Sequence, residues 1–372
     1  MKEINLASVI VAKRREKGIT QDAVAAYIGV SKASVSKWET GQSYPDITFL
    51  PQLATYFNIS IDELMDYSPQ MEQANIAKLY TRLAEDFASL PFDEVIAECA
   101  TIIKKYYSCF PLLLQIVKLY TNHFTLAGTQ EQKELLLNET VKLCERIQIE
   151  SGDVQLSNEA VLYQSVCCLA LKSPQRVLNL LGESVRPMTP KGLLISQAYQ
   201  LMGNIGKAQE TLQAELYQYV MASFQGLLNV MQINIDNIEK AEETFLRASD
   251  FARIFNMKQL NPNNVILLYA LGAHMYCSNN FLEKSVELLG KYVDTCVGGF
   301  FPFELHGDSF FDLIDPWLND CNVAAPRSEQ VIKESMMRDV LMNPAFDSLR
   351  EDPEYQRLVQ KMNNFLGGGN GI

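Results

Sequence analysis

Short helical hairpins of similar length recur along most of this 372-residue sequence. From residue 72 onward the apolar residues follow the period of an α-helix, and no long segment alternates as a β-strand does. Tight polar turns divide this region, and the helix after each turn carries a small or apolar residue near its start. These residues lie 31 to 44 positions apart and are Val95, Leu136, Val177, Ala208, Ala241 and Ser285. Repeats of this length predict stacked helix hairpins, and therefore an all-α fold.

One of these hairpins resembles a tetratricopeptide repeat. Residues 194–208 place Tyr199 and Gly203 late in the first helix and Ala208 just after the turn. The resemblance predicts an α-solenoid of tetratricopeptide-like helix hairpins over residues 72–366; a globular helical bundle is the alternative. A solenoid of this kind has a concave surface that binds peptides or proteins. The aromatic, glycine-rich stretch from about residue 298 is expected to cap the solenoid, before a flexible tail at 367–372.

The composition indicates a globular protein. Hydrophobic residues make up 48% and charged residues 20% of the sequence, which excludes extensive disorder. The longest nearly continuous apolar run covers residues 265–277, whereas a membrane-spanning helix needs about 20 residues. Near the N-terminus, basic residues follow the apolar run, in the reverse order of a secretory signal. We therefore expect a cytoplasmic protein without a membrane partner.

The cysteines and histidines do not form a pattern typical of a metal site. Eight cysteines and three histidines are present without a CxxC pair, whereas zinc sites use closely spaced ligands. Residues 203–207 contain glycine and lysine as a phosphate-binding loop does, but the remaining positions of that motif do not match. His306, beside Asp308, is expected to form a local hydrogen bond. We therefore expect buried, reduced thiols, no metal, no cofactor and no enzymatic activity.

Positive charge is concentrated at the N-terminus of an otherwise acidic chain. The net charge is −12, yet residues 1–40 hold seven Lys and Arg against four acidic residues. Residues 68–372 carry 25 basic and 36 acidic residues. A polyanionic partner is therefore expected to contact only the first forty residues.

The first 67 residues divide into five short helices joined by sharp turns. Helices are predicted over residues 5–17, 21–27, 32–40 and 47–57, and a fifth begins at the Ser60–Glu63 capping box. The glycines at 18, 29 and 41 follow the first three helices, where left-handed C-caps favour glycine. Only residues 28–30 separate the second helix from the third, and this turn has the length found in helix-turn-helix motifs.

The third helix has two distinct faces. Val35 and Trp38 lie three positions apart and are expected to face the core. The opposite face is short, polar and basic, which suits insertion into the major groove, where lysine binds guanine. Its residues are Lys32, Ala33, Ser34, Ser36 and Lys37. An ordinary solvated helix face is the alternative interpretation.

Residues 18–41 resemble the Xre-type (phage-repressor-like) helix-turn-helix, and the similarity extends over about residues 4–67. The resemblance implies that Gln21 contacts a DNA phosphate and that Lys32, Ala33 and Lys37 face base edges. It further places Ser31, Trp38 and Thr40 near the DNA backbone and pairs Arg14 with Glu39. Ala33 and the serines replace the Gln or Arg that is common in this family, so direct base readout is expected to be modest.

The order of domains resembles that of peptide-pheromone-responsive regulators of Gram-positive bacteria. The resemblance implies a DNA-binding domain at 1–67, a linker at 68–71 and a sensor and dimerisation domain at 72–366. It predicts a homodimeric, sequence-specific regulator of transcription that binds a double-stranded DNA operator and takes part in quorum sensing through a signal peptide. The alternatives are a DNA-tethered scaffold whose repeats dock a protein partner and a dimeric regulator without a ligand.

Amide and tyrosine side chains recur on the expected first helices of the middle hairpins. Amides can pair with both the N–H and the C=O of an extended peptide, and tyrosines offer a flat apolar wall with a polar tip. The candidate effector-binding residues are Tyr163, Gln164, Gln197, Gln200, Asn229, Gln232 and Tyr269.

Overall fold

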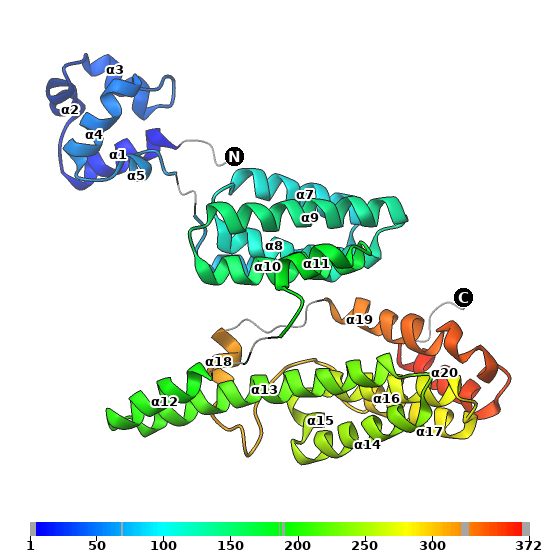
Figure 1. Ribbon diagram of the computed structural model, residues 1–372. Coiled ribbons are helices and arrows are strands. Elements are labelled where there is room, and N and C mark those ends of the chain that lie inside the picture. Colours follow the sequence, from blue (N-terminus) through cyan, green and yellow to red (C-terminus); the bar gives the residue numbers. More distant parts are fainter. Residues whose placement is uncertain (1–4, 68–69, 186, 188–189, 321–326, 367–372) are drawn as a thin grey trace. The chain divides into compact units, whose positions relative to one another are not determined.

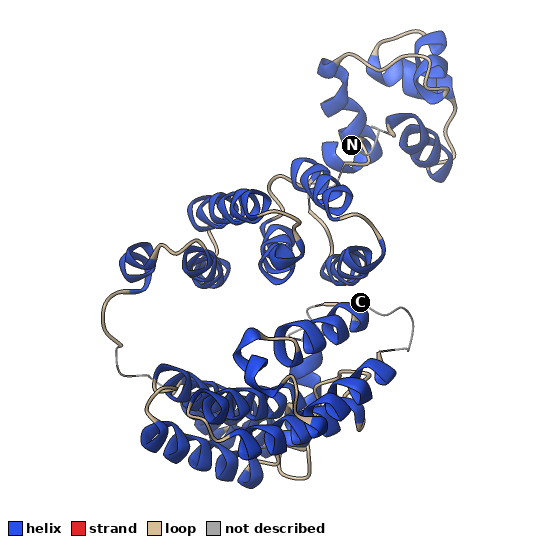
Figure 2. Cartoon of the chain, turned by 90° about the vertical axis from the view of Figure 1, so that its right-hand side faces the viewer, coloured by secondary structure: helices blue, strands red, loops and turns tan. Residues whose placement is uncertain are grey.

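The computed structural model describes residues 5–67, 70–185, 187, 190–320 and 327–366. Within these ranges every regular element is a helix, which confirms the predicted all-α class (Figures 1 and 2). No helix in the described ranges is long and apolar enough to cross a membrane. The chain forms two compact units, the first made of residues 1–81 and 91–181 and the second of residues 82–90 and 182–372.

The N-terminal region (residues 5–67) contains five α-helices, as predicted. They are α1 (Leu6–Glu16), α2 (Gln21–Ile28), α3 (Lys32–Glu39), α4 (Leu50–Phe57) and α5 (Ile61–Leu64). This region has a core of its own, built only from its own helices and their flanks. The buried residues of this core are Leu6, Ile10, Val24, Ala25, Ile28, Val35, Trp38, Leu53, Ala54, Phe57 and Leu64.

The predicted caps of this region are present, and one predicted helix is divided. Ser60 Oγ accepts a hydrogen bond from the Glu63 N–H at 3.1 Å, and the Glu63 carboxylate accepts one from the Ser60 N–H at 2.8 Å. The predicted helix over 47–57 instead begins as a 3₁₀ turn, η1 (Ile47–Phe49), before α4. Pro51 near the start of α4 has no N–H to donate to the preceding turn, which explains the break.

The rest of the first unit is a succession of helices. These are α6 (Gln73–Ser89, whose last residues belong to the second unit), α7 (Phe92–Lys105), α8 (Phe110–His123), η2 (Phe124–Leu126), α9 (Gln130–Glu150), α10 (Val154–Ala170) and α11 (Pro174–Leu181). Consecutive helices from α8 to α11 pack against one another.

The second unit continues the pattern of hairpins. Its helices are α12 (Lys191–Leu201), α13 (Ile205–Ile233), α14 (Ile238–Ile254), α15 (Met257–Leu260), α16 (Pro262–Ser278) and α17 (Leu282–Val297). Small residues bring paired helices together: Ser196 Oγ donates to the Ala208 carbonyl at 3.0 Å, and Ser285 Oγ donates to the Ala273 carbonyl at 2.8 Å. The hairpins are unequal, because α13 has 29 residues and α12 has 11.

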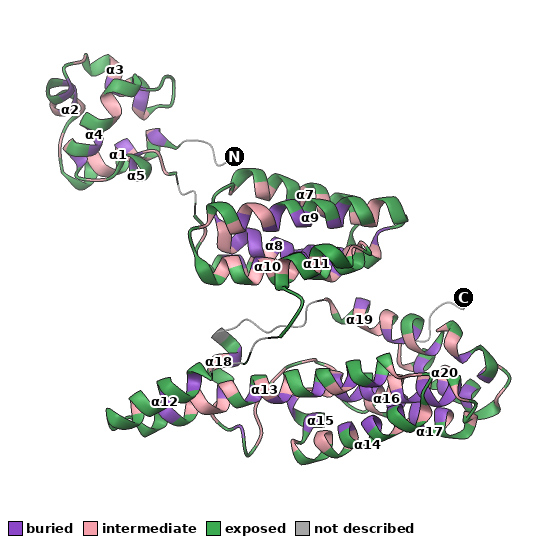
Figure 3. Ribbon diagram, viewed as in Figure 1, coloured by how far each residue is buried: buried purple, intermediate pink, exposed green. Residues whose placement is uncertain are grey.

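The C-terminal segment packs onto the last hairpin. It contains α18 (Asp315–Asp320), α19 (Glu329–Ser335), the π-helix η3 (Met336–Leu341), the 3₁₀ helix η4 (Pro344–Leu349) and α20 (Pro353–Phe365). Phe300 and Phe311 are buried in the core of the second unit, and α20 packs on α17 (Figure 3). The capping role expected of this segment stays a prediction. The expected tail at 367–372 and residues 68–69 of the expected linker lie outside the described residues.

Candidate functional site

Side-chain caps fix the geometry of the α2–α3 hairpin. Thr20 Oγ1 accepts a hydrogen bond from the Ala23 N–H at 3.2 Å, and Ser31 Oγ accepts one from the Ser34 N–H at 3.1 Å. Between the two helices, Gly29 takes the left-handed conformation with φ of 83°, which glycine adopts without a steric penalty. The chain therefore reverses direction over a few residues, and α3 begins at the position that the sequence predicts.

The two faces of α3 differ as predicted. Val35 and Trp38 are 0% and 5% exposed and belong to the core of the N-terminal region. Lys32, Ala33 and Lys37 are exposed. Ser34 and Ser36 are half-buried at the edge between the two faces. The exposed side of α3 is thus polar and basic, as a helix that enters the major groove requires.

An ion pair and an amide join the start of α2 to the end of α3. The Arg14 guanidinium donates to both carboxylate oxygens of Glu39, at 2.5 Å and 3.0 Å. Gln21 Nε2 donates to Glu39 Oε2 at 2.9 Å. Burial of the Glu39 carboxyl opposes its ionisation, but the hydrogen bonds from Arg14 and Gln21 outweigh this effect and hold its pKa below the ordinary value. Arg14 and Glu39, which the resemblance pairs, thus form a bidentate, largely buried contact.

This network determines which way the Gln21 amide points. Because Glu39 is a carboxylate, it accepts hydrogen bonds only, so the NH₂ group of Gln21 must face it. The amide nitrogen keeps a second N–H, which is free to donate to an anion. The expected phosphate contact of Gln21 is thus compatible with its place in the network.

The other residues that are expected to contact DNA differ in how much of each side chain is exposed. Ser31 is exposed, and its hydroxyl lies 2.9 Å from that of Ser34. Thr40 is exposed, and its hydroxyl donates to the Ser36 carbonyl at 2.9 Å. The indole of Trp38 packs in the core, so only its small exposed remainder could approach DNA.

One polar contact of this surface was not predicted from the sequence. Lys32 Nζ lies 2.7 Å from Asp22 Oδ2, and both side chains are largely exposed. The two residues are ten positions apart and belong to different helices, so the i,i+4 spacing that indicates ion pairs within one helix does not apply. Only the three-dimensional fold of the hairpin reveals the pair.

The candidate effector residues of the first unit are mostly engaged with neighbouring side chains. Gln164 on α10 is 4% exposed. Its amide donates to Glu145 at 3.1 Å and accepts from Gln148 at 2.8 Å. The Lys118 ammonium lies 5.8 Å from the ring of half-buried Tyr163, and burial raises the pKa of that phenol to about 12.

The second unit holds the other five candidates. Gln197 and Gln200 are exposed on α12, where Gln200 Nε2 donates to Ser196 Oγ at 3.3 Å. Tyr269 on α16 is half-buried. Asn229 and Gln232 are exposed on α13 and line the same cavity. Of the seven residues, these two are the ones that a described cavity brings together.

This cavity, of about 300 Å³, lies between α13, α16 and the C-terminal segment. Gln225, Asn229 and Gln232 place three carboxamides on one face of α13. Leu271 and Phe346 contribute apolar surface. Asp339 of the π-helix and Asn343 add polar groups, and π-helical turns often occur at functional sites. The sequence did not indicate that the capping segment would form part of this wall.

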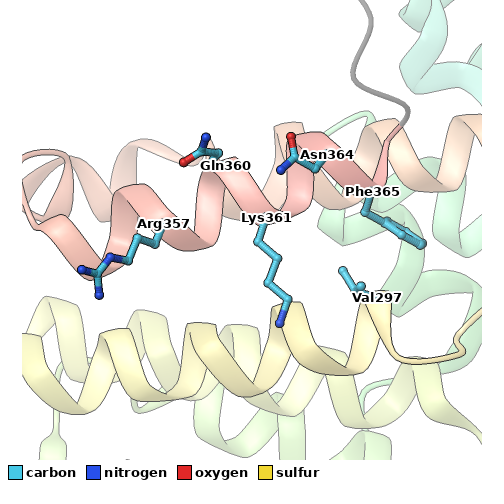
Figure 4. A pocket seen from close by; sticks show the side chains of 6 residues that line it. All are labelled: Val297, Arg357, Gln360, Lys361, Asn364 and Phe365. Atoms are coloured by element: carbon cyan, nitrogen blue, oxygen red, sulfur yellow. The ribbon is translucent and has the colours of Figure 1, made fainter.

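A second groove of about 480 Å³ lies between the end of α17 and α20. Figure 4 shows Arg357 and Lys361 extending from α20 toward α17, while Gln360 and Asn364 point away from it. Lys361 Nζ spans the groove and lies 2.6 Å from Asp294 Oδ1. None of the predicted effector residues lines this groove.

The cysteines, histidines and acidic residues have the contacts expected of structural groups. In the described ranges, no cluster of three or more His, Cys, Asp or Glu is arranged to hold a metal. The seven described cysteines are buried, and Cys321 lies outside the described residues. His306 Nδ1 lies 2.7 Å from the Gly307 carbonyl oxygen, and Asp308 accepts hydrogen bonds from the N–H groups of Phe310 and Phe311. These contacts are local.

A match to a known protein family lies within the N-terminal region. The family model described as helix-turn-helix matches residues 10–64. The HTH-type transcriptional activator BcrR of Enterococcus faecalis is 32% identical to this chain over 73 residues. The match covers 18% of this chain and 36% of BcrR, so the chain matches little more than a third of the length of that relative. No solved structure matches the chain.

Proposed function

We propose that this protein is a sequence-specific DNA-binding regulator of transcription that inserts α3 into the major groove of an operator. The observation that carries this proposal is the exposed, basic face of Lys32, Ala33 and Lys37 on a helix whose other face is in the core. The family match over residues 10–64 and the similarity to a transcriptional activator support it. The wider proposal covers domains at 1–67 and 72–366, joined by a linker at 68–71.

The residues of the hairpin divide between two tasks. Lys32 and Lys37 reach base edges, and lysine donates to guanine O6 and N7. Gln21 binds a phosphate through its remaining amide N–H, and Ser31 and Thr40 lie beside the DNA backbone. Phosphate contacts fix the register of the protein on the duplex, whereas base contacts determine the sequence.

Substitution of the lysines tests this assignment. The operator is first selected from a randomised DNA library with the full-length protein. Lys32→Ala or Lys37→Ala should then weaken operator binding by about 1–3 kcal/mol. Gln21→Ala should weaken it with less change in sequence preference. Lys291→Ala, at an exposed residue of α17, is the matched control and should bind normally. Unchanged affinity in a folded Lys32→Ala/Lys37→Ala variant would contradict the proposal.

The second part of the proposal is a homodimer assembled through the helices beyond residue 70. Helix-turn-helix dimers bind half-sites one turn, about 34 Å, or a multiple of it apart. The helices beyond residue 70 offer far more apolar surface for assembly than α1–α5. Light scattering of the full-length protein should therefore give the mass of a dimer, and the selected operator should contain two related half-sites. A monomer at tens of micromolar, with a single half-site, would argue against this assembly.

The third part is an effector site in the cavity between α13, α16 and the C-terminal segment. Gln225, Asn229 and Gln232 present carboxamides that can both donate to and accept from a peptide backbone. Leu271 and Phe346 can hold an apolar side chain. A short peptide, rather than a large protein partner, fits a cavity of about 300 Å³. The acidic body of the chain favours a neutral or basic peptide.

The effector proposal is tested with peptides fractionated from cultures of the source organism. A fraction that binds should raise the thermal stability of the full-length protein and change its operator affinity, because an effector must favour one arrangement of the DNA-binding regions. Asn229→Ala and Gln232→Ala should abolish both effects. Gln200→Ala lies outside the cavity and should retain them. A protein that responds to no fraction would favour the ligand-free dimer, and capture of a folded protein partner would favour the scaffold.

A further inference from the structure

A salt bridge joins the starts of the two helices of the helix-turn-helix. Lys32 is the first residue of α3 and Asp22 is the second residue of α2, and Lys32 Nζ lies 2.7 Å from Asp22 Oδ2. The two side chains are 60% and 62% exposed. Exposed ion pairs contribute little to folding, so stability does not account for this contact.

The position of Lys32 also opposes the electrostatics of its own helix. A helix N-terminus carries partial positive charge and favours acidic residues. The first turn of α3 nevertheless contains no acidic residue and begins with a lysine. Asp22 lies in the first turn of α2, where its charge is favourable, and its carboxylate partly neutralises the positive charge of Lys32. This arrangement points to a role for the pair outside folding.

The distance between Lys32 Nζ and Asp22 Oδ2 is close to the distance between two atoms at the major-groove edge of a G·C base pair. The N-terminal residues of a recognition helix contact base edges in the major groove. Lysine donates to guanine O6 and N7, and a carboxylate accepts from the cytosine N4 amine. Guanine O6 and cytosine N4 are hydrogen-bonded to each other, so they lie about 2.9 Å apart, close to the 2.7 Å between Nζ and Oδ2. We propose that Lys32 and Asp22 together read one G·C base pair, in one strand orientation.

Asp22 determines which orientation of the base pair, G·C or C·G, the two residues recognise. A T·A pair also places an acceptor beside a donor, but the thymine methyl group replaces guanine N7 and removes one acceptor from lysine. Reversing the pair to C·G exchanges the donor and the acceptor, so that the Asp22 carboxylate would face guanine O6. The carboxylate also repels phosphates, so it restricts Lys32 to the base edge. Asp22 is therefore a specificity-determining residue, and this inference rests on the DNA-binding function proposed above.

The test compares operator selection by four full-length proteins: the wild type, Asp22→Ala, Lys32→Ala and Asp62→Ala. Asp62 is the matched control, because it is the exposed second residue of α5, just as Asp22 is the exposed second residue of α2. Each protein selects sites from a randomised DNA library, and each is then titrated with the selected site and with unrelated DNA. Hydrogen exchange of residues 5–67 verifies that every variant is folded.

The wild type should select a G·C pair in one orientation at one position. Lys32→Ala and Asp22→Ala should both lose this preference, by about tenfold, at the same position. Asp22→Ala should also bind unrelated DNA more tightly, and Asp62→Ala should behave as the wild type. If Asp22→Ala keeps the wild-type preference, or if it and Lys32→Ala alter different positions, the shared reading is wrong. If the wild type selects no sequence, the DNA-binding function itself fails and this inference fails with it.

Discussion

The N-terminal region and the second unit are stabilised in different ways. In residues 5–67, a small apolar core is supplemented by a few directional polar contacts: the Arg14–Glu39–Gln21 network and the side-chain caps of α2, α3 and α5. In the second unit, the core is broad and apolar, with side chains such as Phe224 and Tyr292 almost fully buried. The contrast teaches that directional polar contacts supplement a small apolar core in the N-terminal region, whereas the hairpins depend on the fit of many apolar side chains.

Removal of a large apolar side chain should give the largest effect. Phe224 on α13 is 0% exposed, so Phe224→Ala should destabilise the second unit by about 3–5 kcal/mol through lost burial and a cavity. Phe310→Ala removes a ring that is 60% exposed and should cost far less. Hydrogen-exchange mass spectrometry measures both effects by region. Equal losses in residues 5–67 and in α13–α17 would show that the two regions do not unfold separately.

Disruption of the Arg14–Glu39–Gln21 network should have the next largest effect. This effect should fall on the N-terminal region rather than on the second unit. Arg14→Ala leaves the largely buried Glu39 carboxylate with only the Gln21 amide. Because Arg14 is partly exposed, we expect a loss of about 2–3 kcal/mol, somewhat below that of a fully buried pair. Arg247→Ala breaks an exposed pair on α14 and should cost less than about 0.5 kcal/mol. Hydrogen exchange of α1–α5 for Arg14→Ala and of α14 for Arg247→Ala should resolve the difference. Similar losses of protection in both variants would refute the importance of burial.

Low pH should also destabilise the N-terminal region more than the second unit. The folded-state pKa of Glu39 lies below its ordinary value near 4.5. A group of this kind stabilises the fold above its unfolded-state pKa, and that stability disappears as the pH falls through the folded-state pKa. Residues 5–67 should therefore lose exchange protection below about pH 4.5. Glu39→Gln, which cannot titrate, should flatten this dependence, and an unchanged pH profile would exclude Glu39 as its cause.

A single helix cap should give the smallest effect. Ser31→Ala removes the acceptor for the Ser34 N–H at the start of α3 and should cost about 1 kcal/mol. Ser31→Asp keeps an N-cap acceptor and should restore the stability, yet it places a negative charge beside DNA and should weaken operator binding. Thermal unfolding and operator titration separate the two readouts. If Ser31→Ala were as stable as the wild type, the cap would not determine where α3 begins.

The sequence predicted the N-terminal region more fully than the remainder, for a physical reason. Caps such as Thr20 and Ser31 act on N–H groups three residues away, so short-range patterns reveal them. The Arg14–Glu39 pair spans 25 residues, and only resemblance to a family indicated it. Lys32, Ala33 and Lys37 were correctly placed on the exposed face of α3, because helical period alone decides that placement.

Short-range sequence patterns did not predict the packing between helices that are distant in the sequence. At Gly272 on α16, a Cβ would lie 2.7 Å from the Phe245 ring and 2.8 Å from the Leu288 side chain. This close approach requires glycine, but the sequence does not show which helices meet there. Likewise, Gln164 was predicted as an effector-binding residue but is buried, whereas Asn229 and Gln232 line a cavity that the C-terminal segment helps to form. The partners of these residues lie far away in the sequence.

The length of α13 gives the second unit a mechanical property. A continuous helix of 29 residues is about 44 Å long. The short helix α12 packs against α13, and the cavity lies beside Gln225, Asn229 and Gln232 toward the other end of α13. A stiff rod of this length works as a lever: a tilt of about 5° about one end displaces the other end by about 4 Å. A tilt of α13 at the cavity would therefore displace the α12 hairpin without any change in the hydrogen bonding of α13.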